Sequence, residues 1–243
     1  MIFIYFNRQR GDKTMIFKYL FCLVMIISIW DINILLSGGK MTENNIKLTK
    51  PKFTGKLSLE EAIHNRRTIR SYSDKPVMIE ELSQLLWACQ GVTSSDGKRT
   101  APSAGALYPL EIFIVVGNVK DLGAGIYRYK PDEHTLKLVE SGDRRFELEK
   151  AALSQAQIST AAVDIVITSI YKKLSWKYGD RSVRYAHIEV GHAAQNVLLQ
   201  AQSLGLGVCP IGAFNDENVK KVLKLKEEEP VYILTVGKVK ENR

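Results

Sequence analysis

The chain has 243 residues, 45% of them hydrophobic and 25% charged, a composition typical of a globular protein with a sizeable core. Its formal net charge of +8 is uneven, since residues 1–50 hold seven Lys/Arg and three Asp/Glu while the rest hold 27 and 23. The part after residue 50 is thus only mildly basic, which argues against nucleic-acid binding, and three cysteines without a C-x-x-C pair suggest neither a disulfide framework nor a zinc site.

The N-terminal segment differs from everything after it. Basic residues precede an apolar run from Tyr19 to Trp30, which is short for a transmembrane helix but suits the apolar region of a signal peptide. Alternatively, Met41 or an earlier methionine is the true start. We therefore expect residues 1–50 to be a signal- or anchor-like segment with a leader, whose membrane association would involve residues 15–36. Residues 51–243 are expected to be the folded domain.

Two helices are predicted early in this domain, after a polar and extended arm. Ser58 and Glu61 have the spacing of a capping box, which predicts a helix that begins at Ser58 and ends near residue 66. Between Ile79 and Gly91 the apolar residues recur at helical spacing, and the glycine is a typical helix stop.

The remaining elements alternate irregularly between strands and helices. A loop rich in Gly, Ser and Pro precedes a buried strand, and a hairpin, further helices and further strands follow. The expected ranges are a strand at 111–117, hairpin strands at 125–129 and 135–140, a helix from Asp143 to Leu153, a strand at 163–171, a helix at 183–204, a strand within 206–214, a helix from Asp216 to Leu225 and a strand at 230–239. This order predicts an α+β fold, and no G-x-G-x-x-G motif follows a strand.

The helix at 183–204 is unusual in its composition. Its second half carries few charges and several small residues, in the stretch GHAAQNVLLQAQSLG. A helix with so little polar surface is expected to be buried on most sides.

Three arginines, Arg66, Arg67 and Arg70, stand within five positions in the stretch RRTIR. If this stretch is extended, Arg66, Thr68 and Arg70 share one face and could converge on one ligand. Guanidinium groups donate paired hydrogen bonds that suit a phosphate. The alternative is a solvated basic turn without a ligand.

Two stretches of small residues favour the ligand interpretation. Ser103, Ala104 and Gly105 precede a buried strand, and residues 210–213 follow another. Small residues leave backbone amides uncovered, so a flat molecule can approach closely. One arginine cluster and two such platforms would suit a planar ligand with a phosphate tail.

Four stretches in this order resemble the nitroreductase-like flavoprotein family over about residues 56–240: SLEEAIHNRRTIRSY, PSAGALYP, EVGHAAQNVLLQAQSLGLG and CPIGAF. The second stretch is most similar to the subgroup that includes azoline-forming dehydrogenases of peptide natural products. The resemblance implies an α+β fold with a central mixed or antiparallel sheet flanked by helices. It also implies FMN as cofactor and a homodimer, with the FMN site and the long buried helix at the dimer interface.

The resemblance assigns FMN-binding positions residue by residue. Arg66 and Arg70 would hold the phosphate, Arg67 would touch the pyrimidine side, and the third segment would present backbone N–H groups to N5 and O4 of the flavin. Basic phosphate contacts near the C-terminus would fall at Lys238 or Arg243. The full set is Arg66, Arg67, Thr68, Arg70, Ser103, Ala104, Gly105, Pro210, Ile211, Gly212 and Ala213.

This chain departs from the common family pattern at two of these places. Common members have an Asn and a Gln-Pro-Trp where Ser103, Ala104 and Gly105 stand, and Glu-Gly at the turn that holds Gly212 and Ala213 here. The backbone role of that turn can survive the change. No catalytic side chain and no metal are predicted, because the flavin carries the hydride.

Several other residues have both structural and functional interpretations. His192 is expected to be a hydrogen-bonded core residue rather than a catalyst, and Gln195 and Asn196 could either bridge subunits or cap internal polar groups. Trp87 and Cys89 are expected in the core. The pocket candidates, any of which could instead be packing residues, are Tyr108, Tyr127 and Tyr178.

The expected function is an FMN-dependent oxidoreductase that passes electrons from NADH or NADPH through flavin N5 to a nitroaromatic, a quinone or a similar small acceptor. One alternative is an azoline dehydrogenase that uses FMN and oxygen, although enzymes of that kind often carry extra peptide-binding domains. Another is a non-enzymatic basic module that binds membranes or nucleic acid. Because no twin-arginine pair precedes the apolar run, we expect a cytoplasmic protein, with a membrane anchor or export as alternatives.

Overall fold

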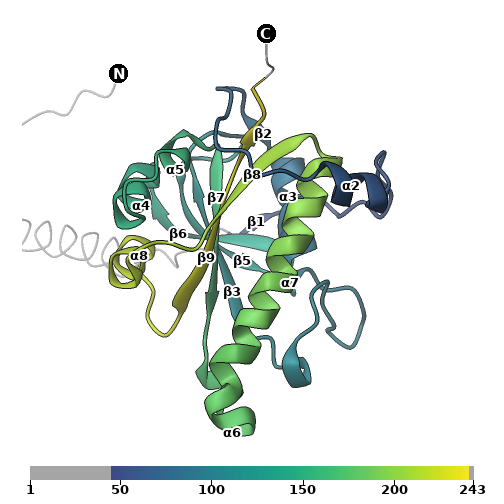
Figure 1. The fold of residues 1–243 in the computed structure, drawn as a ribbon, viewed down its shortest axis with the longest axis vertical. Coiled ribbons are helices and arrows are strands. Elements are labelled where there is room, and N and C mark those ends of the chain that lie inside the picture. The colour runs from purple at the N-terminus through teal and green to yellow at the C-terminus, as the bar shows by residue number, and fades with distance from the viewer. Residues whose placement is uncertain (1–44, 241–243) are drawn as a thin grey trace, which may run out of the picture. The chain divides into compact units, whose positions relative to one another are not determined.

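A seven-stranded sheet runs through residues 45–240, the part of the chain that this computed structural model describes (Figure 1). The strand order is β1-β6-β5-β3-β7-β9-β8, and every neighbouring pair is antiparallel. The strands are β1 (Asn45–Lys47), β3 (Leu110–Val116), β5 (Gly125–Lys130), β6 (Thr135–Ser141), β7 (Val163–Ser169), β8 (Leu206–Ile211) and β9 (Glu229–Lys238), and a separate pair is formed by β2 (Val77–Met78) and β4 (Val119–Lys120). The α+β prediction is confirmed.

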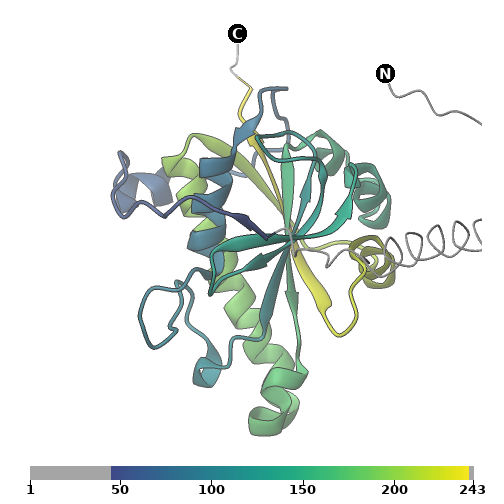
Figure 2. The same cartoon turned by 180° about the vertical axis from the view of Figure 1, so that it is seen from behind.

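Helices cover both faces of the sheet, as Figures 1 and 2 show. One face carries α3 and α7, which pack against each other, and the other carries α4, α5 and α8. The helices are α2 (Leu59–Asn65), α3 (Ile79–Gln90), α4 (Arg145–Ala151), α5 (Gln157–Thr160), α6 (Lys172–Tyr178), α7 (Ser182–Ser203) and α8 (Asp216–Leu223), with 3₁₀ turns η1 (Ala104–Ala106) and η2 (Gly179–Arg181).

The central strands are mostly apolar because the sheet is covered on both sides. On β3, Ile112 and Ile114 face the core under α3 and α7, whereas Phe113 and Val115 face the core under α4, α5 and α8. Side chains on a strand alternate between faces, so a strand buried on both faces needs a continuous apolar run. This explains the apolar stretch IFIVV at residues 112–116, which follows the charged Glu111.

Helix boundaries follow local capping signals closely at the first two helices. Ser58 Oγ accepts from the Glu61 backbone N–H (3.1 Å), and a Glu61 carboxylate oxygen accepts from the Ser58 backbone N–H (2.9 Å), so the predicted capping box is confirmed. The first helix ends at Asn65. The second ends at Gln90, directly before Gly91.

Three later expectations need correction. The helix predicted from Asp143 begins at Arg145 and already ends at Ala151, although Asp143 Oδ1 does accept from the Arg145 backbone N–H (3.1 Å). The cap of α8 is Asn215, whose side chain accepts from the Asn218 backbone N–H (2.9 Å), not Asp216. The strand predicted over 163–171 ends at residue 169, and the chain then forms α6, for which no helix was predicted.

Within one chain, the long helix α7 is buried on one side and exposed on the other, and the expectation that a partner chain covers the rest stays a prediction. Its apolar side packs on α3 and the sheet through residues such as Val190, Val197 and Ala201. His192, expected in the core, is exposed. It belongs to an exposed stripe that we call the α7 stripe, which consists of Arg184, His187, Ile188, Gly191, His192 and Gln195.

The N-terminal segment, Met15 and Met41 included, and Arg243 lie outside the described residues, so the predictions about them stay predictions. Within residues 45–240, none of the helices has the length and apolar character needed to cross a membrane. The sheet begins at Asn45, where β1 pairs with β6.

Candidate cofactor site

The stretch that carries the arginines crosses the edge of the sheet at β8. The backbone N–H of Ile69 donates to the carbonyl of Val208 (3.0 Å). The β8–β9 register places Gly207 opposite Gly237, and the stretch lies over this pair. A Cβ at Gly207 would come within 2.8 Å of Ile69, and a Cβ at Gly237 within 2.7 Å of the Tyr72 ring. The two glycines therefore leave room for the side chains of Ile69 and Tyr72 to pack directly on the sheet.

Tyr72 anchors this crossing from the other end. Its hydroxyl donates to the carbonyl of Ile69 (2.8 Å) and also lies 2.5 Å from Thr235 Oγ1 on β9. Burial raises the pKa of the Tyr72 hydroxyl, so it stays a neutral donor. The stretch before Tyr72 is thus held in one place relative to β8 and β9.

Arg66 and Arg70 are both available to a ligand. Arg66 is half-buried and Arg70 is exposed, and neither forms an ion pair with an acidic side chain among residues 45–240. Arg70 reaches toward the thiol of Cys209 on β8, as does Gln157 on α5. Burial raises the pKa of the Cys209 thiol, and the nearby Arg70 and Gln157 counteract part of that increase. A guanidinium beside β8 without a carboxylate partner is suited to bind an anion.

Arg67 has a different role in this structure. Its Nη1 atom donates to the carbonyls of His64 (2.9 Å) and Arg66 (2.8 Å), at the C-terminal end of α2. These carbonyls have no partner within the helix, so a cation there stabilises the helix end. The predicted contact between Arg67 and the flavin stays a prediction.

Residues 210–213 lie at the end of the same strand. Pro210 and Ile211 close the ladder with β9, and the exposed Gly212 and Ala213 follow directly. The carbonyl of Ala213 accepts from the Gln155 side-chain amide (2.8 Å), which fixes the turn. Two of the three predicted segments are therefore neighbours, because residues 68–70 and 210–213 both flank β8.

The third predicted segment forms the turn η1 and is conformationally strained. Gly105 has φ 61° and Tyr108 has φ 46°, in the left-handed region that few residues adopt. Ser103 Oγ accepts from the Tyr108 backbone N–H (2.9 Å). A Cβ at Gly105 would lie 2.7 Å from the hydroxyl of Tyr178 and 2.9 Å from Lys177 Nζ, so the glycine lets both side chains approach the turn.

This third segment does not meet the other two within one chain. Gly105 contacts the end of α6, which precedes α7, whereas β8 follows α7 after a two-residue link. A 22-residue helix is about 33 Å long, and Figure 1 shows α6 at one end of α7 and the start of β8 near the other. One chain therefore carries two separated half-sites.

Sequence reasoning missed two polar groups beside this third segment. Lys177 lies on α6, which was not predicted. Glu189 lies on α7 and is only 1% exposed, near Ser103. A charged residue on a long helix is typical of a solvated face, so nothing in the sequence indicated that Glu189 is buried.

Several of the alternative residues now have definite surroundings. The Asn196 amide donates to the carbonyl of Thr100 (3.2 Å), whereas Gln195 is exposed. Tyr127 is buried and its hydroxyl donates to the Gly123 carbonyl (2.8 Å), which is a packing role.

Two residues outside the three segments were also predicted. Lys238, a predicted phosphate contact, forms an ion pair with Glu81 (2.6 Å). Cys89 is fully buried on α3, as predicted.

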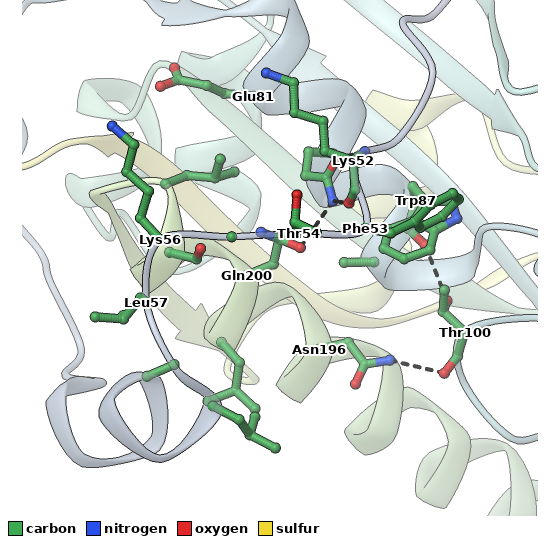
Figure 3. A pocket seen from close by; sticks show the side chains of 18 of the residues that line it. Lys52, Phe53, Thr54, Lys56, Leu57, Glu81, Trp87, Thr100, Asn196 and Gln200 are labelled. Carbon is green, nitrogen blue, oxygen red and sulfur yellow. Dashed lines mark hydrogen bonds between the residues drawn. The ribbon is translucent and has the colours of Figure 1, made fainter.

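An open hollow of about 1260 Å³ lies elsewhere, between residues 49–59, α3 and the second half of α7 (Figure 3). Trp87, expected in the core, is only half-buried and lines this hollow, where it packs edge-on against Phe53 at 5.6 Å between ring centroids. Gln84 donates to Gln200 (3.1 Å) across it. No residue of the predicted FMN set lines this hollow, so it is distinct from the candidate cofactor site.

A model of the nitroreductase family matches residues 63–238. The chain belongs to the nitroreductase family. A nitroreductase-like protein of Methanocaldococcus jannaschii is 42% identical over 182 residues, which cover 75% of this chain and 91% of the relative. The microcin B17-processing protein McbC of Escherichia coli is 26% identical over 215 residues, which cover 83% and 79% of the two chains.

Solved structures agree with this assignment. A nitroreductase-like protein of Anabaena variabilis is 35% identical with a TM-score of 0.72, and the match covers 81% of this chain but only 42% of that one. The microcin synthetase complex McbBCD of Escherichia coli contains a chain that is 25% identical with a TM-score of 0.63, over 85% of this chain and 82% of that chain. Family membership supports an oxidoreductase of the flavin type, not a non-enzymatic basic module.

Proposed function

We propose that this protein is an FMN-dependent oxidoreductase that accepts electrons from NADH or NADPH and passes them to a small acceptor such as a nitroaromatic or a quinone. The observation that carries the proposal is the pair Arg66 and Arg70, which have no acidic partner among residues 45–240 and lie beside the exposed turn of Gly212 and Ala213. FMN, when bound, would supply the hydride and electron transfer.

The residues at β8 fit the phosphate half of FMN. Guanidinium groups bind phosphate oxygens through two parallel hydrogen bonds, and both arginines extend from a backbone that Tyr72 and the two glycines hold in place. The half-buried Thr68 lies between them and can add a hydroxyl. In this proposal Gly212 and Ala213 offer backbone N–H groups to the ring system at the end of the same strand.

We propose that a second copy of the chain completes the site. The α7 stripe contains an exposed apolar residue, Ile188, and at its centre Gly191, where an added Cβ would meet nothing within 4 Å. A two-fold axis near Gly191 would pack α7 antiparallel against its copy and place about residue 181 of one chain beside residue 201 of the other. The η1 turn of one chain would then approach the β8 edge of its partner.

In this dimer, Ser103, Ala104 and Gly105 would contact the flavin ring of the partner's half-site. Lys177 and Tyr178 stand beside the same turn and would face a molecule stacked on the ring. A lysine ammonium and a phenol can both donate hydrogen bonds, so they would orient an acceptor that carries oxygen atoms.

Azoline dehydrogenation is the second candidate function. The likeness to McbC and to the chain in the McbBCD complex favours it. In that reaction electrons would flow from the heterocycle through FMN to oxygen.

Three measurements test the proposed function. Heat should release FMN, not FAD, from the purified protein, and light scattering should give a dimer. Stopped-flow spectroscopy should show bleaching of the flavin by NADH or NADPH and its recovery with nitroaromatics or quinones. Bleaching by an azoline peptide but not by either nucleotide would favour the second function. A protein that stays colourless after incubation with FMN, or a monomer with full activity, would contradict the proposal.

A further inference from the structure

Unpaired hydrogen-bonding groups are concentrated around Glu189, beneath the loop that leads to η1. Glu189 is 1% exposed, and within residues 45–240 neither of its carboxylate oxygens has a partner at normal hydrogen-bond geometry, although Ser103 and Gln90 lie close to it. The same holds for two donors close to it, Nε2 of the fully buried Gln90 and Nε of Arg99. Buried polar groups are nearly always paired, and an unpaired one costs about 1–3 kcal/mol.

These groups come from three parts of the fold that meet at the loop. Gln90 is the last residue of α3, Glu189 lies on α7, and Arg99 and Ser103 belong to the loop itself. Arg99 Nη1 donates to Gln90 Oε1 (3.1 Å), and its guanidinium lies 4.6 Å from the centre of the Tyr108 ring. The loop is thus tied to α3 through Arg99 and to α7 through Thr100, whose carbonyl accepts from the Asn196 amide (3.2 Å), while the Glu189 carboxylate takes no part in these bonds.

Acceptors without donors and donors without acceptors therefore lie near one another beneath the loop. Burial raises the pKa of the Glu189 carboxyl to about 7, while Ser103, Arg99, Gln90 and Lys173 act in the opposite direction. Other charged groups around the cluster are already engaged. Lys173 pairs with Glu111 (2.8 Å), and Arg99 Nη2 lies 3.9 Å from Asp132.

We propose that Glu189 is a positioning residue for the cofactor: when a flavin ring packs on η1, the side chains of Ser103, Gln90 and Arg99 close on the Glu189 carboxylate beneath the turn. This holds Ser103, Ala104 and Gly105 against the ring. The inference rests on the proposed function, because it assigns η1 to the ring. It adds a residue that touches neither ring nor substrate.

A proton must leave when this closure occurs. Before closure the carboxyl, with a pKa of about 7, is mostly protonated at pH 6.5, and after closure two or more donors, one of them cationic, stabilise the ionised form. Binding of the ring therefore releases a proton from Glu189. By linkage, affinity for the ring must rise as pH increases toward the pKa of the ring-free protein and level off above it.

Calorimetric titration of the flavin-free full chain with riboflavin tests whether binding of the ring releases a proton from Glu189. Riboflavin replaces FMN because the phosphate of FMN titrates near neutral pH and would add its own protons. Titrations at pH 6.5 in two buffers of different ionisation enthalpy should give release of more than about half a proton by the wild type. The dissociation constant should fall by at least about fivefold from pH 6 to pH 8.

The Glu189→Gln variant should bind riboflavin with no proton release and a flat pH profile. Asp164→Asn is the matched control, since Asp164 is the other fully buried carboxylate whose two oxygens lack partners within residues 45–240, and it lies near Arg145 instead. This variant should release the proton as the wild type does. If Glu189→Gln misfolds, Gln90→Met removes one donor and should at least halve the release.

Each outcome is decisive. Proton release by Glu189→Gln equal to that of the wild type would overturn the inference, as would unchanged release in Gln90→Met or wild-type binding without any release. A wild type that binds neither riboflavin nor FMN would instead overturn the proposed function, and this inference with it.

Discussion

Replacing Glu189 by glutamine should change how the stability of the protein depends on pH. The carboxyl has an ordinary pKa of 4.5 and a pKa of about 7 in the folded chain, because burial penalises the ionised form. Between these values the folded state binds more protons than the unfolded state. The free energy of unfolding of the wild type must therefore fall as pH rises through this window.

The size of the effect follows from the pKa difference. A difference of about 2.5 units at 1.36 kcal/mol per unit corresponds to roughly 3.4 kcal/mol over the whole window. Integration between pH 5 and pH 8 gives about 2.5 kcal/mol, because part of the change occurs below pH 5. Glutamine has nearly the same shape and no charge, so its variant lacks this loss.

Urea denaturation of the wild type and of Glu189→Gln at pH 5, 6, 7 and 8 measures this pH dependence. Both proteins are used without flavin and at one protein concentration, because the stability of a dimer depends on concentration. The difference in unfolding free energy, wild type minus variant, should decrease by about 2.5 kcal/mol from pH 5 to pH 8. Other titrating groups cancel in this difference. A difference that changes by less than about 1 kcal/mol would refute the burial argument for Glu189.

Three further predictions concern the half-sites and the interface. Arg70→Ala should weaken FMN binding by about 1.5–3 kcal/mol, roughly ten- to a hundredfold, but leave riboflavin binding unchanged; equal losses would make Arg70 structural. Gly105→Ala should lower riboflavin affinity more than Gly97→Ala, a control with φ 78° and open space around the added Cβ, and calorimetry compares them. Gly191→Trp should shift light scattering from dimer to monomer and release flavin; a flavin-loaded dimer would place the interface elsewhere.

Local signals in the sequence were sufficient for much of the secondary structure. Ser58 and Glu61 identify the start of α2 because the capping box involves only neighbours along the chain. The apolar stripe of α3 and the apolar run of β3 could also be predicted, because both patterns involve only residues that are close together in the sequence. By contrast, α6 has seven residues and one buried side chain, Leu174, so it is too short to show a helical period.

The candidate site was predicted in its parts but not in its assembly. Motifs identified Arg66, Arg70 and the turn at Gly212, since residue types and spacing carry that information. Only the tertiary structure decided which parts meet, because adjacency depends on the β8–β9 register that aligns Gly207 with Gly237. In the same structure, the length of α7 separates η1 from the arginine stretch and from the turn at Gly212.

Burial of polar groups was likewise decided only by packing. His192 and Glu189 are three residues apart on α7, and the sequence favoured His192 for the core. The structure exposes His192 and buries Glu189. The helical period alone cannot tell which stripe faces α3 and the sheet when both stripes mix apolar and polar residues. That choice depends on the summed burial of the whole helix face, in which one carboxyl is outweighed by the apolar side chains beside it.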